Sequence, residues 1–293
     1  MTDQSIAVAV AQFAPGADVE QNLATIRSLA ITAADRGARL VVFPEYSSFF
    51  VDPVGPAMVE AAQPLDGPFV NAIGALAVEL GIHIVVGTIE QVPDVHKFSN
   101  TLVALDPNGR TVATYRKQHL YDAFGGRESD WVLAGDLAAP QLFDVDGLRV
   151  GLQTCYDLRF PELTRLIVDA GAELVVVPAE WVRGPLKEHH WSTLVAARAI
   201  ENTVFIAAAD HTPPIGVGLS TIVDPMGVAL ATLGERADVA LALVSSARVA
   251  QVRTVNPALT LRRYTVAPRT GALHPAPPRP AAPKSAAPPS IVS

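Results

Sequence analysis

Residues 148–163 read LRVGLQTCYDLRFPEL, and this stretch indicates the fold class more directly than any other part of the chain. Its first five residues form a short apolar run that is typical of a strand buried in a sheet. Cys155 follows at the turn after this strand, where a side chain is exposed and backbone N–H groups can bind a developing oxyanion. The position predicts a nucleophilic cysteine, although a lone cysteine after a strand can also be a small buried hydrophobe.

Similar apolar runs recur along the sequence and predict further strands that are buried on both faces or nearly so. They cover residues 6–11, 40–43, 82–86, 148–152, 174–177, 204–208 and 239–244. Between them, apolar residues recur at helical spacing over residues 19–36, and a second helix is predicted over 187–201. The first helix has Asp18 at the expected N-cap position and ends at Gly37.

Two further runs, at 102–105 and 111–115, flank the turn sequence DPNG and predict a β-hairpin. A chain that mixes strand-helix alternation with hairpins is expected to form mixed sheets of the α/β class rather than purely parallel ones. Residues 1–267 are expected to form one domain. Residues 268–293 are rich in Pro and Ala and contain almost no large apolar residue, so this tail is predicted to be disordered.

The 293-residue chain is 49% hydrophobic with a formal net charge of −7, which fits a globular enzyme. Its basic residues are scattered rather than clustered, which argues against a nucleic acid as the partner. A single cysteine excludes an internal disulfide and favours a reducing compartment. The N-terminus lacks the basic residues of a signal peptide and the apolar runs are shorter than a bilayer, so we expect a soluble cytoplasmic protein that does not bind membranes.

Two charged residues also follow apolar strands. Glu45 comes directly after RLVVFP, and Lys117 lies just past the predicted strand at 111–115. Carboxylates seldom lie beside such runs unless they are solvated, paired or functional. Taken singly, each is an ordinary loop charge in most proteins. An acid, a cation and a thiol at three strand ends are nevertheless expected to meet at one edge of a sheet.

Three motifs occur in an order that resembles one known family. They are VVFPE at 41–45, YRKQHLYD at 115–122 and CYDLRFPEL at 155–163. In these motifs the chain resembles the nitrilase superfamily of carbon-nitrogen hydrolases. The resemblance implies a four-layer α-β-β-α sandwich with two mixed sheets, and assembly into a homodimer or larger homo-oligomer. It also implies Glu45 as the base, Lys117 as the cationic stabiliser and Cys155 as the nucleophile.

Further site residues are expected from the resemblance or from their positions. Glu128 corresponds to a second glutamate near the nucleophile in relatives, although a solvated loop acid fits the same pattern. Trp181 lies where relatives shape the substrate pocket, although a large aromatic residue at a strand end is as often plain packing. The backbone N–H of Tyr156 is expected to bind the oxyanion with Lys117. Arg183 is either a partner for a substrate carboxylate or an ordinary surface arginine.

The residues after the nucleophile favour one branch of the superfamily. Tyr156 and Asp157 stand where nitrilases tend to have Trp, a pattern similar to the amidase branch that contains omega-amidase and deaminated glutathione amidase. The implied reaction is hydrolysis of a small carboxylated amide through a thioester, with release of ammonia or an amine. No metal or organic cofactor is expected, since the seven histidines lack metal-ligand spacing. The alternatives are a nitrile hydrolase of the same superfamily and a catalytically silent binding member.

Overall fold

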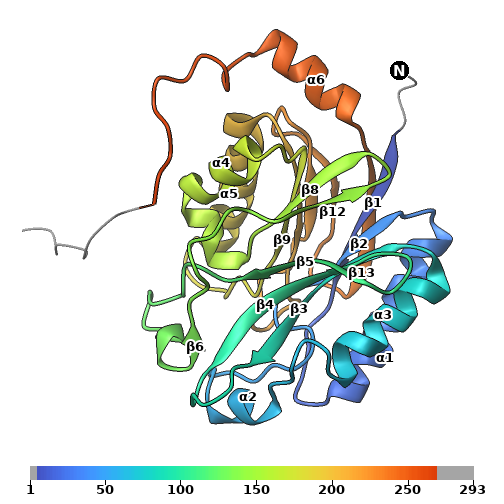
Figure 1. Cartoon of the computed structure of the whole chain (residues 1–293), viewed down its shortest axis with the longest axis vertical. Coiled ribbons are helices and arrows are strands. Elements are labelled where there is room, and N and C mark those ends of the chain that lie inside the picture. The colour runs from blue at the N-terminus through green and yellow to red at the C-terminus, as the bar shows by residue number, and fades with distance from the viewer. Residues whose placement is uncertain (1–4, 269–293) are drawn as a thin grey trace, which may run out of the picture.

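The computed structural model describes residues 5–268, which form two β-sheets stacked face to face with helices on both outer sides (Figure 1). The first sheet has the strand order β13-β1-β2-β3-β4-β5, and the short strand β6 pairs with one end of β4. Strands β1, β2 and β3 run parallel, the pairs β13–β1, β3–β4 and β4–β5 are antiparallel, and β6 pairs parallel with β4. Its strands are β1 (Ile6–Gln12), β2 (Leu40–Val42), β3 (His83–Gln91), β4 (Phe98–Leu105), β5 (Thr111–Arg116), β6 (Val132–Leu133) and β13 (Asp238–Val244).

The second sheet has the strand order β12-β11-β10-β9-β8-β7. Its three central strands, β8, β9 and β10, are parallel, and the strands on either side are antiparallel. Both sheets are therefore mixed, as the sequence predicts. The strands are β7 (Leu142–Val145), β8 (Leu148–Leu152), β9 (Leu174–Pro178), β10 (Phe205–Ala209), β11 (Thr221–Val223) and β12 (Ala229–Thr232).

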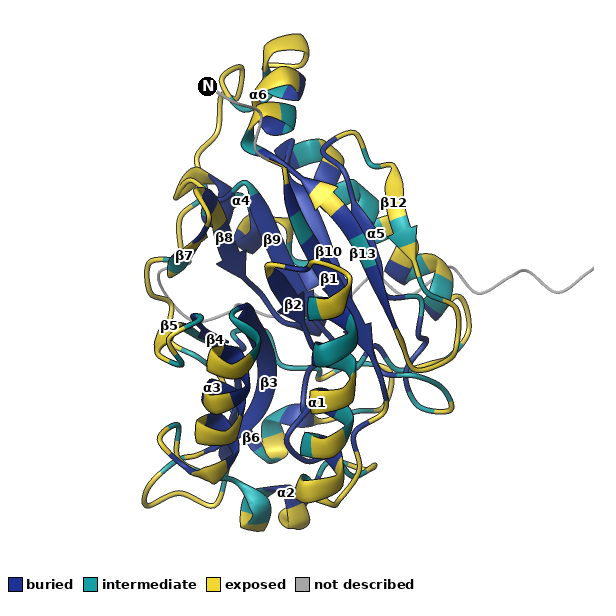
Figure 2. Cartoon of the chain, turned by 90° about the vertical axis from the view of Figure 1, so that its right-hand side faces the viewer, coloured by how far each residue is buried: buried dark blue, intermediate teal, exposed yellow. Residues whose placement is uncertain are grey.

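Helices cover the two outer faces and complete a four-layer α-β-β-α sandwich. Figure 2 shows α1 (Val19–Asp35) and α3 (Pro68–Leu80) side by side over the first sheet, with their outer faces exposed. Helices α4 (Pro161–Asp169) and α5 (Lys187–Asn202) cover the second sheet. The remaining helices are α2 (Pro56–Ala61) and α6 (Ser246–Val255).

Successive side chains of each inner strand pack against the two neighbouring layers in turn, which explains why the strand sequences are continuous apolar runs. In β1, Val8 and Val10 pack into the core between the sheets, whereas Ala9 and Ala11 pack under α1 and α3. Because successive side chains of a strand point to opposite faces, a strand in an inner layer must be apolar on both. The seven strands predicted from such runs are confirmed.

The predicted helices and hairpin are also confirmed. The carboxylate of Asp18 caps α1 by accepting hydrogen bonds from the backbone N–H groups of Glu20 and Gln21. No helix among residues 5–268 is long and apolar enough to cross a membrane. The tail predicted to be disordered, residues 268–293, lies outside the described residues except for its first residue, and the domain boundary stays a prediction.

Candidate active site

Strand ends from both sheets meet at one edge of the sandwich. Glu45 follows β2 and Lys117 follows β5 in the first sheet, whereas Cys155 follows β8 in the second. All three side chains line a single cavity of about 400 Å³. The structure therefore brings the thiol, the carboxylate and the ammonium group together, and their catalytic roles stay predictions.

The ammonium group of Lys117 lies between two carboxylates. Its Nζ donates hydrogen bonds to Glu45 Oε1 and to a carboxylate oxygen of Glu128, each at 2.9 Å, and the side chain is only 2% exposed. Burial by itself lowers the pKa of Lys117, but the charges of Glu128 and Glu45 outweigh it and hold the pKa well above that of an ordinary lysine. Lys117 is therefore a fixed positive charge in a buried site.

Three donors hold the carboxylate of Glu45. They are Nζ of Lys117, Nδ2 of Asn100 at 2.5 Å and the backbone N–H of Glu180 at 2.7 Å. Burial is the largest influence on the pKa of Glu45, and together with the charge of Glu128 it raises this pKa despite the opposing effect of Lys117. A carboxylate with a raised pKa is better suited to accept and return a proton near neutral pH than an ordinary one.

Glu128 lies in a single 3-10 turn (Glu128–Asp130) and accepts a hydrogen bond from the ammonium group of Lys117. Its carboxylate also accepts hydrogen bonds from the Tyr46 hydroxyl at 2.6 Å and from the backbone N–H of Tyr121. Burial tends to raise the pKa of Glu128, but the charge of Lys117 and these hydrogen bonds lower it below the usual value. This glutamate thus stays ionised and fixes the position of the ammonium group.

Cys155 begins a 3-10 turn (Cys155–Arg159) shortly after β8, which ends at Leu152. Its φ of +43° lies in the left-handed region, which is strained for a residue with a side chain and is typical of functional turns. The thiol donates a weak hydrogen bond to the carbonyl oxygen of Glu180 at 3.4 Å. Burial, and then the charge of Glu45, raise the pKa of the thiol well above its usual range. The thiol is therefore protonated at rest and needs a base before it can attack.

Asp157 forms hydrogen bonds that join the turn containing Cys155 to the segment around Lys117. Its buried carboxylate accepts hydrogen bonds from the Tyr115 hydroxyl at 2.7 Å and from the His119 backbone N–H at 3.0 Å, and it contacts the ring Nδ1 of His119 at 2.7 Å. Tyr115 and His119 lie on either side of Lys117 in the chain, whereas Asp157 lies two residues after Cys155. These bonds fix the two catalytic candidates relative to each other across the sheets.

Gly87 of β3 lies against the backbone that carries Glu45. A Cβ at this position would come within 2.7 Å of Glu45 Cα and Pro44 O, and within 2.8 Å of Tyr46 N. Because backbone atoms cannot rotate away, Gly87→Ala is expected to displace Glu45, lower kcat/KM by about tenfold or more and cost about 1–3 kcal/mol of stability. Kinetics and thermal unfolding measure both effects. Gly16→Ala is the matched control, since no atom lies within 4 Å of its added Cβ; equal behaviour of the two variants would contradict the prediction.

The three predicted substrate-binding residues differ in where they lie. Tyr156 and Trp181 border a small recess beside the thiol. Arg183 is not among the residues that line the cavity or the recess. Its guanidinium pairs with Glu188 and Glu235, each at 3.5 Å. Contact of Arg183 with a substrate stays a prediction to which this geometry adds no support.

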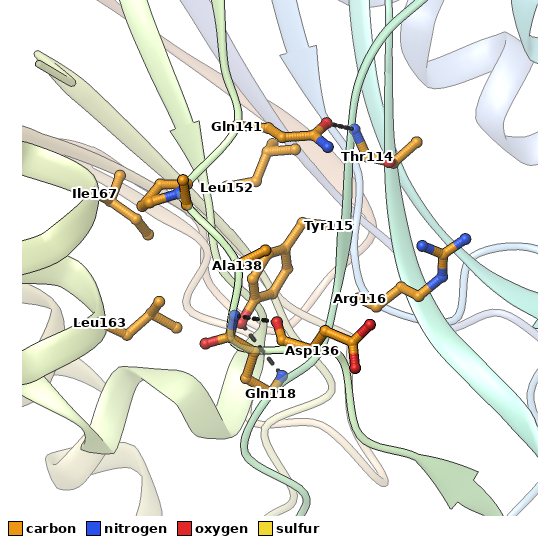
Figure 3. A pocket seen from close by; sticks show the side chains of 12 residues that line it. Thr114, Tyr115, Arg116, Gln118, Asp136, Ala138, Gln141, Leu152, Leu163 and Ile167 are labelled. Carbon is orange, nitrogen blue, oxygen red and sulfur yellow. Dashed lines mark hydrogen bonds between the residues drawn. The ribbon is translucent and has the colours of Figure 1, made fainter. Parts of the chain in front are cut away.

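A second cavity, of about 170 Å³, lies between β5 and α4 (Figure 3). Two glutamines form hydrogen bonds between the segments that line it. Gln141 accepts one from the Thr114 backbone N–H, and Gln118 donates one to the Asp136 carbonyl oxygen. None of the predicted site residues lines it. In the described part of the chain, no three His, Cys, Asp or Glu side chains are grouped so that they could hold a metal ion.

Comparison with known proteins agrees with this geometry. The sequence matches the family model described as carbon-nitrogen hydrolase over residues 7–254. The chain belongs to the carbon-nitrogen hydrolase family. A relative in Escherichia coli O157:H7, named deaminated glutathione amidase, is 43% identical over 257 residues, which are 88% of this chain and 97% of the relative.

Solved structures place this carbon-nitrogen hydrolase in the nitrilase superfamily. The Caenorhabditis elegans NitFhit protein is similar with a TM-score of 0.82 and 30% identity, over 94% of this chain and 71% of that one. A variant of the Nesterenkonia sp. AN1 amidase has a TM-score of 0.72 and 27% identity, over 88% and 94% of the two chains. That variant shows covalent addition of the acetamide moiety of fluoroacetamide at its active site cysteine. The expected superfamily, fold and class of enzyme are confirmed.

Several residues of the hydrolase site were not predicted from the sequence. Asn100 had a detectable signal, because SNT at 99–101 places three polar residues inside an otherwise apolar strand. Glu180 had the same signal as Glu45, an acid that follows an apolar run. His211 had none. Its buried ring donates from Nε2 to the Glu45 carbonyl oxygen at 2.7 Å, and burial lowers its pKa to about 4, so the ring is neutral.

Proposed function

We propose that this chain hydrolyses the carbon-nitrogen bond of a small carboxylated amide through a thioester on Cys155. The observation that carries the proposal is the common cavity of Cys155, Glu45 and Lys117, three residues from distant parts of the sequence. The adduct on the active site cysteine of the Nesterenkonia amidase supports the choice of nucleophile. The name of the E. coli relative supports the substrate class, since glutathione is a peptide that carries carboxylates.

The first half of the reaction forms the thioester. Glu45 accepts the proton of the Cys155 thiol as the sulfur attacks the amide carbonyl carbon, because a protonated thiol is a poor nucleophile. The carbonyl π electrons move to the oxygen, and this oxyanion is stabilised by the Lys117 ammonium group and the backbone N–H of Tyr156. Such a donor contributes about 3–4 kcal/mol to the transition state. When the oxyanion collapses, Glu45 gives its proton to the leaving nitrogen, and ammonia or an amine departs.

The second half of the reaction releases the acid. Glu45 accepts a proton from a water molecule, and the resulting hydroxide attacks the thioester carbonyl carbon. Collapse of this second oxyanion breaks the carbon-sulfur bond, and the proton held by Glu45 returns to the sulfur. Glu128 takes part in no proton transfer in this scheme; it orients Lys117 through the hydrogen bond described above.

An ammonia-release assay tests the proposal. The panel contains the monoamides of succinate and glutarate, their 2-oxo analogues, neutral amides of equal length and the matching nitriles. We expect the highest kcat/KM with carboxylated amides and equal amounts of ammonia and acid as products. Faster turnover of nitriles than of amides would instead favour the nitrile hydrolase. Cytoplasmic location and assembly into homo-oligomers stay predictions.

A further inference from the structure

Strand β4 places an amide group in the core next to the candidate active site. Leu102 and Ala104 of this strand pack into the core between the two sheets, and Asn100, two residues before Leu102, lies on the same face of the strand. Its side chain is fully buried. A buried amide is unfavourable unless its hydrogen bonds are made, so the partners of Asn100 show what the residue does there.

The amide nitrogen of Asn100 donates to both glutamates of the site. Its Nδ2 lies 2.5 Å from Oε1 of Glu45 and 3.3 Å from Oε1 of Glu128. The ammonium group of Lys117 donates to the same two oxygen atoms, at 2.9 Å each. The two oxygens and the two nitrogens thus form a closed ring of four hydrogen bonds. In this ring each carboxylate oxygen accepts from one charged donor and one uncharged donor.

The backbone of Asn100 holds Lys117 as well. The carbonyl oxygen of Asn100 accepts a hydrogen bond from the Lys117 backbone N–H at 2.9 Å, which continues the pairing between β4 and β5. One residue therefore contacts both carboxylates and the segment that carries the ammonium group. Because a backbone hydrogen bond does not depend on the side chain, a substitution of Asn100 removes the amide bonds alone.

The charges of this cluster do not balance, which explains the need for an uncharged donor. Glu45 and Glu128 are two carboxylates, and Lys117 is the one cation that forms ion pairs with them within the described residues. Like charges in a buried site oppose each other's ionisation. Burial and the charge of Glu128 raise the pKa of Glu45, whereas Lys117 and the hydrogen bond from Asn100 lower it. The amide thus stabilises the ionised carboxylate without adding a charge.

The other end of the amide shows that packing alone does not explain this residue. The Oδ1 atom of Asn100 is buried and accepts no hydrogen bond from any residue between 5 and 268. Rotation of the amide by half a turn would not help, since it would turn Oδ1 toward two carboxylate oxygens. A buried oxygen without a partner destabilises the folded chain. The arrangement satisfies the two glutamates rather than the asparagine.

We infer that Asn100 is a positioning residue of the proposed reaction, whose amide joins the carboxylates of Glu45 and Glu128 and so keeps Glu45 aligned with the Cys155 thiol. The inference rests on the proposed amidase function and adds to it a residue that acts through Glu45. Asn100 is not among the residues that line the cavity, so it has no direct contact with a molecule bound there. Its removal should slow the proton transfers without weakening the binding of substrate.

Two substitutions of nearly the same shape test the inference. Asn100→Leu removes both amide bonds, and Asn100→Asp replaces the donor by a third carboxyl group. For glutaramate, the monoamide of glutarate, kcat of Asn100→Leu should fall by about 10- to 100-fold while KM changes by less than about threefold. The acid limb of kcat/KM should move up by about one pH unit, because ionised Glu45 loses a donor. The limb should move further in Asn100→Asp, which adds a like charge.

The matched control is Thr101→Val, a change of similar shape at the next residue of β4. Thr101 is also fully buried, and its hydroxyl donates to Glu90, which does not line the cavity. This variant should lose stability but keep the wild-type kcat and acid limb. The other groups that face Glu45 are the same in all variants; they are Tyr46, Lys117, Glu128, Cys155, Glu180, Asp210 and the neutral ring of His211.

The position of the acid limb decides between a positioning residue and a purely structural one. A shift of less than about 0.3 pH units in both Asn100 variants, or an equal shift in Thr101→Val, would overturn the inference. Thermal unfolding identifies a variant that does not fold, and the other Asn100 variant then decides.

A second measurement does not depend on amidase activity. If the wild type hydrolyses no amide, the proposed function fails, and the same shift is sought in the rate of Cys155 alkylation by iodoacetamide, which also requires a base for the thiol. The acid limb of alkylation should again move up by about one pH unit in Asn100→Leu. An unchanged limb would refute the role of Asn100.

Discussion

The Cys155→Ala variant is expected to lose at least about 10⁴-fold of kcat while it keeps its fold. The described cavity contains one thiol, and the sequence has no other cysteine that could replace it. Without the sulfur no thioester forms, and Lys117 can stabilise only the slow direct attack of water on the amide. Ammonia release from glutaramate measures the loss.

The stability of this variant provides its control. The side chain of Cys155 is 5% exposed, and alanine removes a single heavy atom from it. The left-handed φ of +43° strains both residues alike, because both have a Cβ. We therefore expect the free energy of unfolding to change by about 1 kcal/mol or less. A folded Cys155→Ala protein that releases ammonia at more than about a hundredth of the wild-type rate would refute the thioester mechanism.

The Glu45→Gln variant is expected to lose about 10³- to 10⁴-fold of kcat, near the upper limit for removal of a general acid-base group. One carboxylate accepts and returns a proton in both halves of the proposed cycle, so both halves slow down. The amide of glutamine has nearly the same shape, and its oxygen can still accept from Lys117 and Asn100, but its NH2 group would then face the backbone N–H of Glu180. Thermal unfolding of the variant therefore separates loss of proton transfer from a disturbed site. Glu60→Gln, an exposed change on α2, is the matched control and should keep wild-type activity.

The pH dependence of the wild type gives an independent test of Glu45. Its carboxyl group must be ionised to accept the thiol proton, and burial holds its pKa above that of an ordinary glutamate, about 4.3. Activity should therefore fall, as the pH is lowered, at a higher pH than an exposed glutamate would give. An acid limb centred near 4 or below in kcat/KM would contradict this role.

Labelling of the single cysteine separates an enzyme from a catalytically silent binding member. Iodoacetamide should modify Cys155 stoichiometrically in the wild type, and much more slowly in Glu45→Gln, because the thiol has a raised pKa and depends on its base. An unreactive thiol in both proteins would favour the binding member. Mass spectrometry of the intact chain measures the extent of reaction.

The inner strands could be predicted from the sequence because a strand that is buried on both faces is a continuous run of apolar residues. Helix α3 was not predicted, and its packing explains why. Its sequence PFVNAIGALAVEL is apolar nearly all round and contains Gly74, which usually argues against a helix. A Cβ at Gly74 would lie 2.9 Å from the carbonyl oxygen of Gly109 in the β4–β5 turn, so the glycine reflects close packing of two segments.

The three central side chains of the site could be predicted because each directly follows a strand or its turn. Their hydrogen-bond partners could not be assigned from the sequence, because these contacts join residues that are far apart in the chain. Tyr46 donates to Glu128 and Asn100 donates to Glu45, and although the polar residues 99–101 stand out in an apolar strand, nothing in the sequence says which carboxylate Asn100 binds. Arg183 was predicted to contact the substrate, whereas the cations that border the small recess beside Cys155 are Lys187 and Arg159. The position of a cation in the sequence does not show whether its side chain already forms an ion pair with a carboxylate.

Because the residues of the candidate site come from both sheets, the proposed chemistry also depends on the interface between the sheets. Glu45 is joined to the opposite sheet by the Glu180 N–H and by His211, and Asp157 is joined in the same way to Tyr115. A slide of one sheet past the other by a single ångström would separate proton donor from acceptor while every strand remained paired. Substitutions such as Val10→Ala, deep in the interior and remote from any ligand, should thus impair the chemistry before they unfold the chain. The enzyme depends on alignment of two halves as much as on the side chains each half supplies.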